Sequence, residues 1–282
     1  MVPRQRSHGN CADIALQPSN GLFYLRTVTA TRYVTALREG GSLPAIIEAD
    51  DQGMYVLKFR GAGQGPKALI AELVAGEIAR ALDLPIPEIV FVELDPELAR
   101  TEPDPEIQHL IKSSAGLNLA LDYLPGAVTF DPLTEKPAAA LASAIVWFDA
   151  FVSNVDRTPR NANLLVWHRK PWLIDHGAAL YFHHQWEGVA ARPENAFALI
   201  KDHVLLPLAS CLADADAQSA ARLTPKIIAQ IVARIPETWL DGGAPFVDAD
   251  ACRAAYADYF ARRLQEPRAF VEEAIRAQLR HI

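Results

Sequence analysis

The segment from Asn154 to Gly177 constrains the fold more than any other part of this 282-residue chain. It reads NVDRTPRNANLLVWHRKPWLIDHG, in which two apolar runs, 164–167 and 172–174, flank a short basic turn. Two such runs joined by a turn predict a β-hairpin that is preceded and followed by loops. Three side chains that carry an acid or an amide are then expected at one end of the hairpin: Asp156, Asn161 and Asp175.

These three side chains have the chemistry of a magnesium–phosphate site. Two carboxylates and an amide are hard oxygen donors, which suit a Mg²⁺ ion that carries substrate phosphates. An Asp, an Asn five residues later, an apolar hairpin and then Asp-x-Gly is also the spacing found in phosphoryl-transfer sites. On this template Asp156 faces the acceptor hydroxyl, while Asn161 and Asp175 hold the metal. Asn163 is the alternative ligand, and the spacing favours Asn161 over it.

The segment resembles the catalytic and metal-binding segments of HipA-like kinases, and more distantly those of phosphoinositide kinases and protein kinases. The likeness extends to residues 55–84 and, more weakly, over most of the chain. It departs from the protein-kinase pattern where Asn154-Val155 precedes Asp156 in place of His-Arg, and where the triplet Asp175-His176-Gly177 lacks a Phe. The second departure argues against a switch based on the packing of that Phe.

The resemblance implies an α+β protein with a two-lobed, protein-kinase-like fold, in a compact version of the family. We expect a β-rich N-lobe with one main helix over residues 1–121, and a mostly helical C-lobe over residues 122–282. The length is consistent with one large domain or two lobes, and half of the residues are hydrophobic, so a large core can be buried. Apolar spacing predicts C-lobe helices over 138–153, 194–200, 203–213, 224–234, 248–264 and 266–280.

A lysine and a glutamate complete the expected nucleotide site. Lys58 lies within the apolar, strand-like run 55–59; it is either a solvated lysine at a sheet edge or the strand lysine that neutralises nucleotide phosphates. The following helix carries Glu72 and Glu77, which are five residues apart and therefore about 140° from each other around the helix. Only one of them can face Lys58. The resemblance places the family's helix glutamate at Glu72, so Glu77 is expected at the surface.

Two further stretches are candidates for nucleotide contacts. The turn Gly40-Gly41-Ser42 lies between strand-like runs, and its glycines would let main-chain N–H groups approach a phosphate. An ordinary hairpin turn is the equally weighted alternative. Residues Tyr123 and Leu124 lie where the connector between two kinase lobes is expected, and there the main chain would contact the adenine edge.

Composition limits the remaining classes of function. The net charge of −7 argues against general nucleic-acid binding, which needs a basic surface. Residues 1–21 contain no apolar signal-peptide core, and the most apolar stretch, 138–152, is too short to span a membrane. The three cysteines are odd in number and far apart, so they predict neither a disulfide framework nor a zinc site. We therefore expect a cytoplasmic protein.

The sequence thus predicts an ATP-dependent kinase that uses Mg²⁺ to transfer the γ-phosphate to a hydroxyl group. A protein serine or threonine is the favoured acceptor, and if the resemblance extends to biology, an antitoxin-like partner is implied. Three alternatives remain open at this point: a nucleotide-binding pseudokinase that acts by interaction, nucleotidyl transfer on the same fold, and phosphorylation of a small molecule or lipid.

Overall fold

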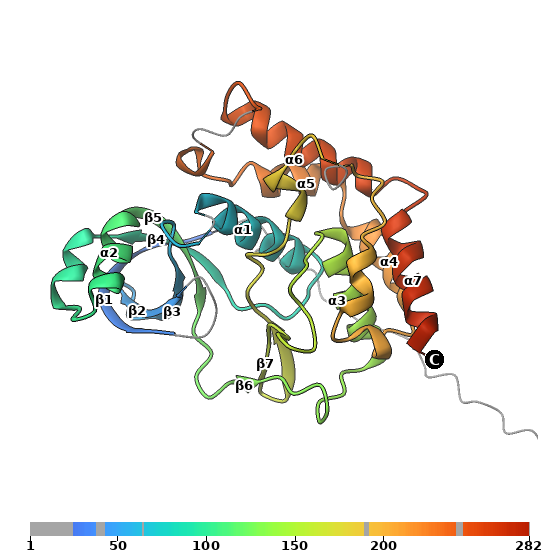
Figure 1. Cartoon of the computed structure of the whole chain (residues 1–282), viewed down its shortest axis with the longest axis horizontal. Coiled ribbons are helices and arrows are strands. Elements are labelled where there is room, and N and C mark those ends of the chain that lie inside the picture. Colours follow the sequence, from blue (N-terminus) through green and yellow to red (C-terminus); the bar gives the residue numbers. More distant parts are fainter. Residues whose placement is uncertain (1–24, 38–42, 64, 189–191, 241–244, 282) are drawn as a thin grey trace, which may run out of the picture.

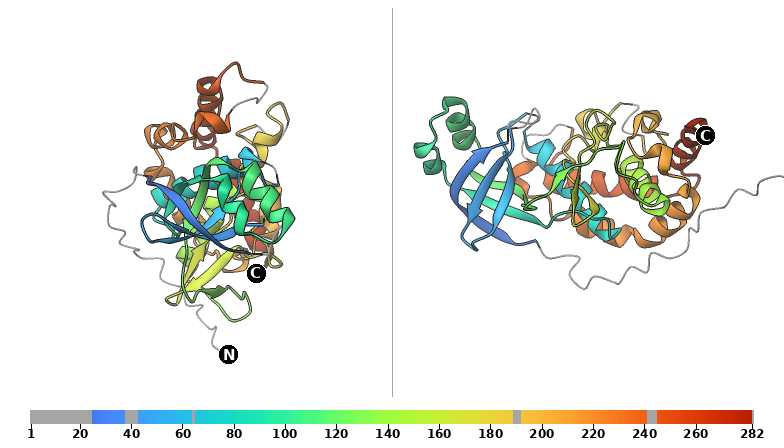
Figure 2. Two further views of the ribbon diagram at one scale, coloured as in Figure 1. Left: turned by 90° about the vertical axis from the view of Figure 1, so that its left-hand side faces the viewer. Right: turned by 90° about the horizontal axis from the view of Figure 1, so that it is seen from below.

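The structure, a computed structural model, describes residues 25–37, 43–63, 65–188, 192–240 and 245–281. A closed β-barrel lies on one side and a group of helices on the other, with helix α1 between them (Figure 1). The right-hand view of Figure 2 shows the same separation, with the barrel in blue to green and the later helices in orange to red. The candidate phosphate turn Gly40-Gly41-Ser42 lies outside the described residues.

The barrel is built from five strands in the order β1-β2-β3-β5-β4, and it closes because β1 pairs in parallel with β4. Its interior is filled by apolar side chains from every strand, including Val28, Ile47, Leu57, Val90 and Ala120. Aliphatic and β-branched residues suit these half-buried, pleated positions. The strands are β1 (Thr27–Ala36), β2 (Ala45–Ala49), β3 (Met54–Lys58), β4 (Ile89–Leu94) and β5 (Gly116–Asp122).

Two short helical elements, η1 (Pro96–Thr101) and α2 (Pro105–Ser113), contribute to the same hydrophobic core as the barrel. Helix α2 begins with Pro105 in its first turn, and the carboxylate of Asp104 accepts a hydrogen bond from the Glu106 N–H at 2.9 Å. Such a cap satisfies one of the N–H groups that have no partner within the helix. Ile107, Leu110 and Ile111 form its buried face.

Helix α1 (Pro66–Ala81) belongs to the larger hydrophobic core, which it shares with the C-terminal helices. Gly76 lets this helix approach β4 closely, since a Cβ at that position would lie 2.4 Å from Cδ1 of Ile89. Glu77 was expected at the surface, and this prediction is wrong: its side chain is 1% exposed and pairs with Arg80 and Arg234. Helix α5 (Pro225–Val232) packs against α1, and Arg234 follows directly after it.

The C-terminal helices pack around α3, whose Trp147 and Phe151 are fully buried and stacked on each other. The prediction of a helix over 203–213 is wrong, because that stretch contains the short 3₁₀ turn η5 (Leu206–Leu208), around a proline, and only the first two residues of α4. Residues 194–200 likewise hold only the start of a 3₁₀ turn, η4 (Ala198–Asp202). The helices are α3 (Ala139–Phe151), α4 (Leu212–Arg222), α5 (Pro225–Val232), α6 (Ala249–Arg263) and α7 (Ala269–Gln278).

Arg263, at the end of α6, joins two parts of this helical region. Its side chain is 2% exposed and lies over the ring of Phe270, with the guanidinium carbon 4.7 Å from the ring centroid. Within the described part of the chain, the guanidinium group donates to main-chain oxygens, and so ties residues 193–195 to the C-terminal end of α3. The accepting residues are Ala150, Phe151, Pro193 and Asn195.

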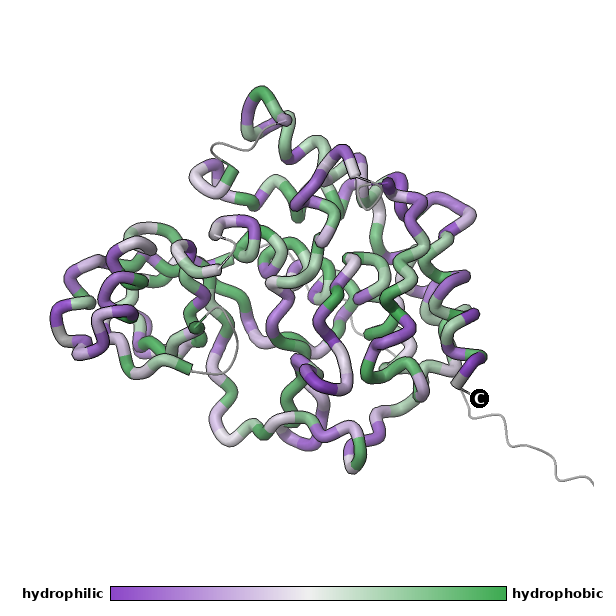
Figure 3. Tube along the Cα trace, viewed as in Figure 1, coloured by the Kyte–Doolittle hydropathy of each residue, from purple (hydrophilic) through white to green (hydrophobic). Residues whose placement is uncertain are grey.

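Hydropathy follows this packing: apolar stretches gather along the central helices, and hydrophilic ones lie on the outer faces (Figure 3). None of the described helices has both the length and the apolar character that a membrane span requires. Cys252 is a buried free thiol. Cys211 is disulfide-bonded, contrary to the expectation drawn from the spacing of the cysteines.

Candidate active site

The predicted hairpin is present and forms a small sheet with β6 (Val128–Thr129). It consists of β7 (Leu164–Trp167) and β8 (Lys170–Leu173), and His168 and Arg169 make its tight turn with φ values of 48° and 64°. At the open end, the main-chain N–H of Ile174 donates to the carbonyl oxygen of Asn163 at 3.1 Å. The hairpin therefore holds the loop before it beside the residues that follow it.

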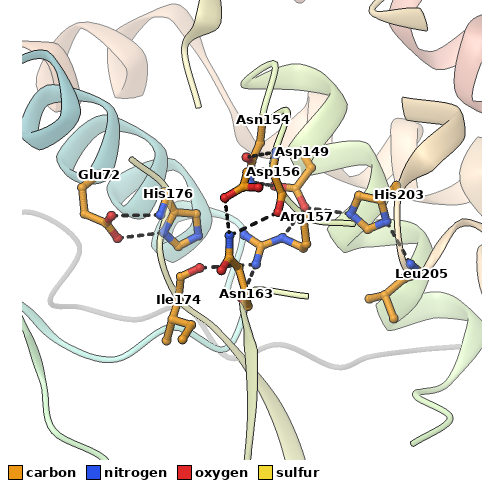
Figure 4. A network of polar contacts seen from close by, with 10 residues as sticks. All are labelled: Glu72, Asp149, Asn154, Asp156, Arg157, Asn163, Ile174, His176, His203 and Leu205. Carbon is orange, nitrogen blue, oxygen red and sulfur yellow. Dashed lines mark hydrogen bonds and ion pairs between the residues drawn. The ribbon is translucent and has the colours of Figure 1, made fainter. Parts of the chain in front are cut away.

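The loop that carries Asp156 begins where α3 ends. Asn154 is buried, and it donates from Nδ2 to Oδ1 of Asp149 at 2.8 Å while its own Oδ1 accepts from the Asp156 N–H at 3.1 Å. Two amides converge on the Asp156 carboxylate: Nδ2 of Asn161 lies 2.8 Å from Oδ2, and Nδ2 of Asn163 lies 3.2 Å from the same oxygen. The close-up shows Asp156 at the centre of this network (Figure 4).

The two asparagines differ in their surroundings. Asn163 is half-buried with φ 46°, donates a second hydrogen bond to the main-chain oxygen of Asp156, and is bonded through its own main chain to Ile174. Asn161 is exposed in a tight turn with Thr158, and Asp156 is the only side chain to which it is hydrogen-bonded in the described part of the chain. Asn163 braces the loop, whereas the exposed side chain of Asn161 is accessible to a ligand.

Lys58 belongs to a second polar cluster of the candidate site, which it forms with Glu72 and Asp175. Its Nζ is 2.7 Å from Oδ1 of Asp175 and 3.7 Å from Oε2 of Glu72, and its side chain is only 11% exposed. This burial rules out the solvated edge lysine that the sequence left open. Glu72, and not Glu77, faces Lys58, as predicted. Burial acts to lower the pKa of Lys58, but the charges of Glu72 and Asp175 outweigh it and raise that pKa above its ordinary value.

Glu72 is held by a residue that the sequence did not nominate for the site. The main-chain N–H of His176 lies 2.9 Å from Oε2 of Glu72, and the ring Nδ1 lies 3.1 Å from Oε1. Both side chains are buried. Burial acts to raise the pKa of Glu72, but the charge of Lys58 and the hydrogen bonds from His176 hold it at about 2. The carboxylate is therefore ionised at neutral pH.

A buried ion pair supports the loop of Asp156 from behind. Nε of Arg157 donates to Oδ2 of Asp149 at 2.6 Å, and neither side chain is exposed. The guanidinium group also donates to the carbonyl oxygens of Asn163 and, at 3.4 Å, Ile174. Arg157 is therefore part of a buried ion pair and is not exposed to a ligand. Arg157 thus ties α3 to the residue before the hairpin and to the residue after it.

His203 completes this network from a distant part of the sequence. Its Nε2 lies 2.9 Å from the same oxygen of Asp149, and its Nδ1 accepts from the main-chain N–H of Leu205 at 3.0 Å. Since Nδ1 accepts, Nε2 carries the proton and donates it to Asp149. The main-chain N–H of Val204 adds a hydrogen bond to the carbonyl oxygen of Arg157 at 3.0 Å. Neither Asp149 nor His203 has a sequence motif that would have marked it.

We expect mild acid to unfold the protein through its buried histidines. Burial lowers the pKa of His203, although Asp149 opposes this, and lowers that of His183 well below its ordinary value. Such a histidine stabilises the fold fully above its unfolded pKa of about 6.5 and loses that contribution as pH falls toward the folded pKa. The melting temperature should be constant from about pH 8 to 7 and should fall steadily below about 6.5.

Asp149 should extend this loss to lower pH. Burial acts to raise its pKa, but the charge of Arg157 and the hydrogen bond from His203 hold the pKa well below its ordinary value. Its contribution is therefore complete above about pH 4 and is lost below that. Melting curves of His203→Asn should show a shallower decline below about pH 6.5, whereas His109→Asn, at an exposed position on α2, should follow wild type. An unchanged decline in the His203 variant would contradict this assignment.

The connector residues Tyr123 and Leu124 follow directly after β5. The main-chain N–H of Tyr123 donates to the carbonyl oxygen of Met54 at 3.0 Å, and the carbonyl oxygen of Leu124 accepts from the N–H of Ala127 at 3.2 Å. These two main-chain groups are thus engaged within the protein. The side chain of Leu124 is buried, at 7% exposure. A role of this connector in adenine binding stays a prediction.

The donor set at the site fits a metal only together with a phosphate ligand. Within the described residues, no group of three or more histidine, cysteine, aspartate or glutamate side chains is arranged to hold a metal ion. Asp175 and the amide oxygen of Asn161 are hard donors, and Mg²⁺ is commonly held by one or two carboxylates plus substrate phosphates and water. The residues present therefore suit a Mg²⁺ ion that arrives with a nucleotide.

Comparison with known families decides the classification. The family model described as HipA-like kinase matches residues 31–266, which is most of the chain. This chain belongs to the HipA-like kinase family. No curated protein matches the sequence of this HipA-like kinase.

Solved structures show the fold of this HipA-like kinase. It is similar to the Helicobacter pylori proinflammatory kinase CtkA, with a TM-score of 0.52 and 13% identity, over 91% of this chain and 99% of the other. The Golgi casein kinase with Mn/ADP bound gives a TM-score of 0.48 and 13% identity, over 91% of this chain and 74% of the other. The similarity to CtkA shows that the HipA-like kinase has a protein-kinase-like fold, with a β-rich N-terminal sheet and a helical C-terminal region.

Proposed function

We propose that this HipA-like kinase transfers the γ-phosphate of ATP, as its Mg²⁺ complex, to a hydroxyl group, with a protein serine or threonine as the acceptor. The observation that carries the proposal is the pair of polar clusters at the open end of the hairpin. In one cluster a buried lysine lies between Glu72 and Asp175. In the other, two amides converge on Asp156. Because the chain belongs to the HipA-like kinase family, phosphoryl transfer is the reaction that we assign to these two clusters.

Each side chain has a role that follows from its position. Asp156 would accept a hydrogen bond from the acceptor hydroxyl and orient it toward the phosphate. Lys58 would neutralise charge on the nucleotide phosphates, and Glu72 would keep the lysine in place. Asn161 and Asp175 would hold Mg²⁺, which would supply charge neutralisation at the transferred phosphate.

Several finer parts of the proposal come from the sequence alone. We place the boundary between an N-lobe and a C-lobe after residue 121, close to the end of β5. The connector at Tyr123 and Leu124 would then contact the adenine, and the turn Gly40-Gly41-Ser42 would contact phosphate. A protein acceptor fits the family, and an antitoxin-like partner is a further expectation of the resemblance.

Thermal unfolding with nucleotide tests the proposal directly. Saturation with Mg²⁺-ATP at about a hundred times its dissociation constant adds roughly 2.7 kcal/mol to the free energy of unfolding. For a chain of this size the melting temperature should rise by roughly 5–10 °C. In Asp175→Asn, which removes the carboxylate that faces Lys58 and the metal, we expect most of the Mg²⁺-dependent part of this rise to disappear.

Asp258→Asn is the matched control, because it makes the same change at an exposed position on α6. This variant should keep the full nucleotide response. A wild type that gains no stability from ATP, GTP or ADP with Mg²⁺ or Mn²⁺ would refute the kinase proposal. Once a substrate is found, the intact mass of the product separates phosphate transfer from AMP transfer. Binding without any turnover would instead indicate a pseudokinase.

A further inference from the structure

His176 replaces the Phe of the protein-kinase triplet and points inward, toward helix α1. It is 0% exposed, and its main-chain N–H and ring Nδ1 contact both oxygens of the Glu72 carboxylate, at 2.9 and 3.1 Å. Figure 4 shows the two side chains facing each other, with a contact to each oxygen. Of the two partners that meet Glu72 in the candidate site, His176 is nearer than Lys58, whose Nζ lies 3.7 Å away.

The distances show which contact holds the Glu72 carboxylate. At 3.7 Å the approach of Lys58 is an ion pair, but it is too long for a hydrogen bond. A buried carboxylate without hydrogen bonds is strongly disfavoured, so the two bonds from His176 stabilise the Glu72 carboxylate in this interior position, together with the charge of Lys58. They also fix its direction: Oε1 faces the imidazole, and Oε2 is shared between the His176 N–H and Lys58.

The other side of the imidazole has no polar role in the described structure. The ring Nε2 is buried and has no hydrogen-bond partner among the described residues. The ring packs edge-on against Phe148 of α3, with centroids 5.7 Å apart and an interplanar angle of 77°. The side chain thus fills an apolar space against α3 and uses its polarity only toward Glu72. An apolar residue of similar size could do the first task but not the second.

A second contact joins the same two segments. Nζ of Lys67, in the first turn of α1, donates to the carbonyl oxygen of His183 at 2.9 Å. Helix α1 is therefore fastened to the segment after the hairpin at two positions, Lys67 and Glu72. Of these two contacts, only the one at Glu72 also reaches Lys58.

We propose that His176 is a positioning residue, which sets the Glu72 carboxylate so that Lys58 is shared correctly between Glu72 and Asp175. The proposal rests on the proposed function, because it concerns the lysine that would meet the nucleotide phosphates. Without the ring N–H, one oxygen of Glu72 is left buried and unpaired, and it draws Lys58 away from Asp175. Nucleotide binding then weakens, although His176 itself touches no ligand.

Two substitutions of similar size separate positioning from packing. In His176→Asn the amide Nδ2 can replace the Nδ1 donor, whereas His176→Leu fills similar space without any donor. We expect His176→Leu to weaken Mg²⁺-ADP binding roughly tenfold or more, the usual size for loss of a residue that orients a ligand-binding group. His176→Asn should recover most of that loss. Isothermal titration calorimetry of the full-length variants measures both.

A double-mutant cycle with Glu72→Gln shows whether the effect passes through Glu72. In the Glu72→Gln background, His176→Leu should weaken Mg²⁺-ADP binding little further. Equal affinities of the Asn and Leu variants, or independent effects in the cycle, would overturn the positioning role. The same cycle in urea unfolding needs no nucleotide, and additive changes there would also overturn it. The wild type could bind no nucleotide while the effects of the Glu72 and His176 substitutions on urea unfolding are still coupled. That result would refute the kinase proposal but support the contact between His176 and Glu72.

Discussion

In the Asp156→Asn variant we expect phosphate transfer to fall by about 10²–10⁴-fold, the usual contribution of a side chain that orients and deprotonates an acceptor. The loss should appear in kcat, with little change in KM for ATP, because the proposed contact is to the acceptor hydroxyl. The loop should keep its shape, since Asn at this position still offers an oxygen to the amides of Asn161 and Asn163. Steady-state kinetics with an identified acceptor measure the effect, and autophosphorylation serves until one is known.

Nucleotide binding is the internal control for this variant. Asp156→Asn should retain the rise in melting temperature with Mg²⁺-ATP, in contrast to Asp175→Asn. Asp202→Asn changes an exposed aspartate outside both clusters and should leave kcat as in wild type. Full activity in Asp156→Asn would remove Asp156 from the reaction. Loss of both activity and nucleotide binding would assign it to the metal site.

The second large effect concerns stability, at the buried pair of Asp149 and Arg157. Replacing Arg157 by Met leaves the Asp149 carboxylate charged and buried with only His203 and Asn154 as partners. Breaking a buried ion pair by removing one partner destabilises a fold by about 3–5 kcal/mol. We expect a loss of that size in the free energy of unfolding, measured by urea denaturation monitored by circular dichroism.

The double replacement Asp149→Leu with Arg157→Met should recover much of this stability. Apolar residues can replace a buried ion pair with little net loss, because the desolvation of two charges is removed at the same time. Activity should not return, since the hydrogen bonds from Arg157 to the carbonyl oxygens of Asn163 and Ile174 stay absent. Arg160→Met is the control: Arg160 is exposed, so stability should change by no more than about 0.5 kcal/mol. If the double variant is no more stable than Arg157→Met, the pair is not the source of the loss.

The sequence predicted those parts of the site that depend on local pattern. Alternating apolar runs around a basic turn identified β7 and β8, and the apolar run that carries Lys58 identified β3. Helical periodicity identified α1. The angle between Glu72 and Glu77 showed that only one of them could face the lysine, and the resemblance indicated which. Each of these inferences relates residues that are close in the chain, where spacing fixes geometry.

Predictions that depended on how a helix or loop packs against the rest of the protein were less successful. Glu77 was expected at the surface because the resemblance placed the glutamate that faces Lys58 at Glu72, yet Glu77 is buried and pairs with Arg234. Residues 203–213 have an apolar composition that suits a helix, but Pro207 and the packing of η5 against α3 give a turn instead. For Glu77 the deciding partner, Arg234, is distant in the sequence, whereas Pro207 lies within the stretch that it shapes.

The sequence by itself determined the order and spacing of the candidate reactive groups, because a hairpin and a helix set those distances within a few residues of chain. Only the tertiary structure decided what holds these groups in place. Asp149 comes from helix α3, Arg157 from the loop after it, and His203 from the link between η4 and η5, and they meet only when α3 is buried. His176 meets Glu72 across 104 residues. Buried polar groups need partners in an interior that excludes water, and which partners are available is settled by packing.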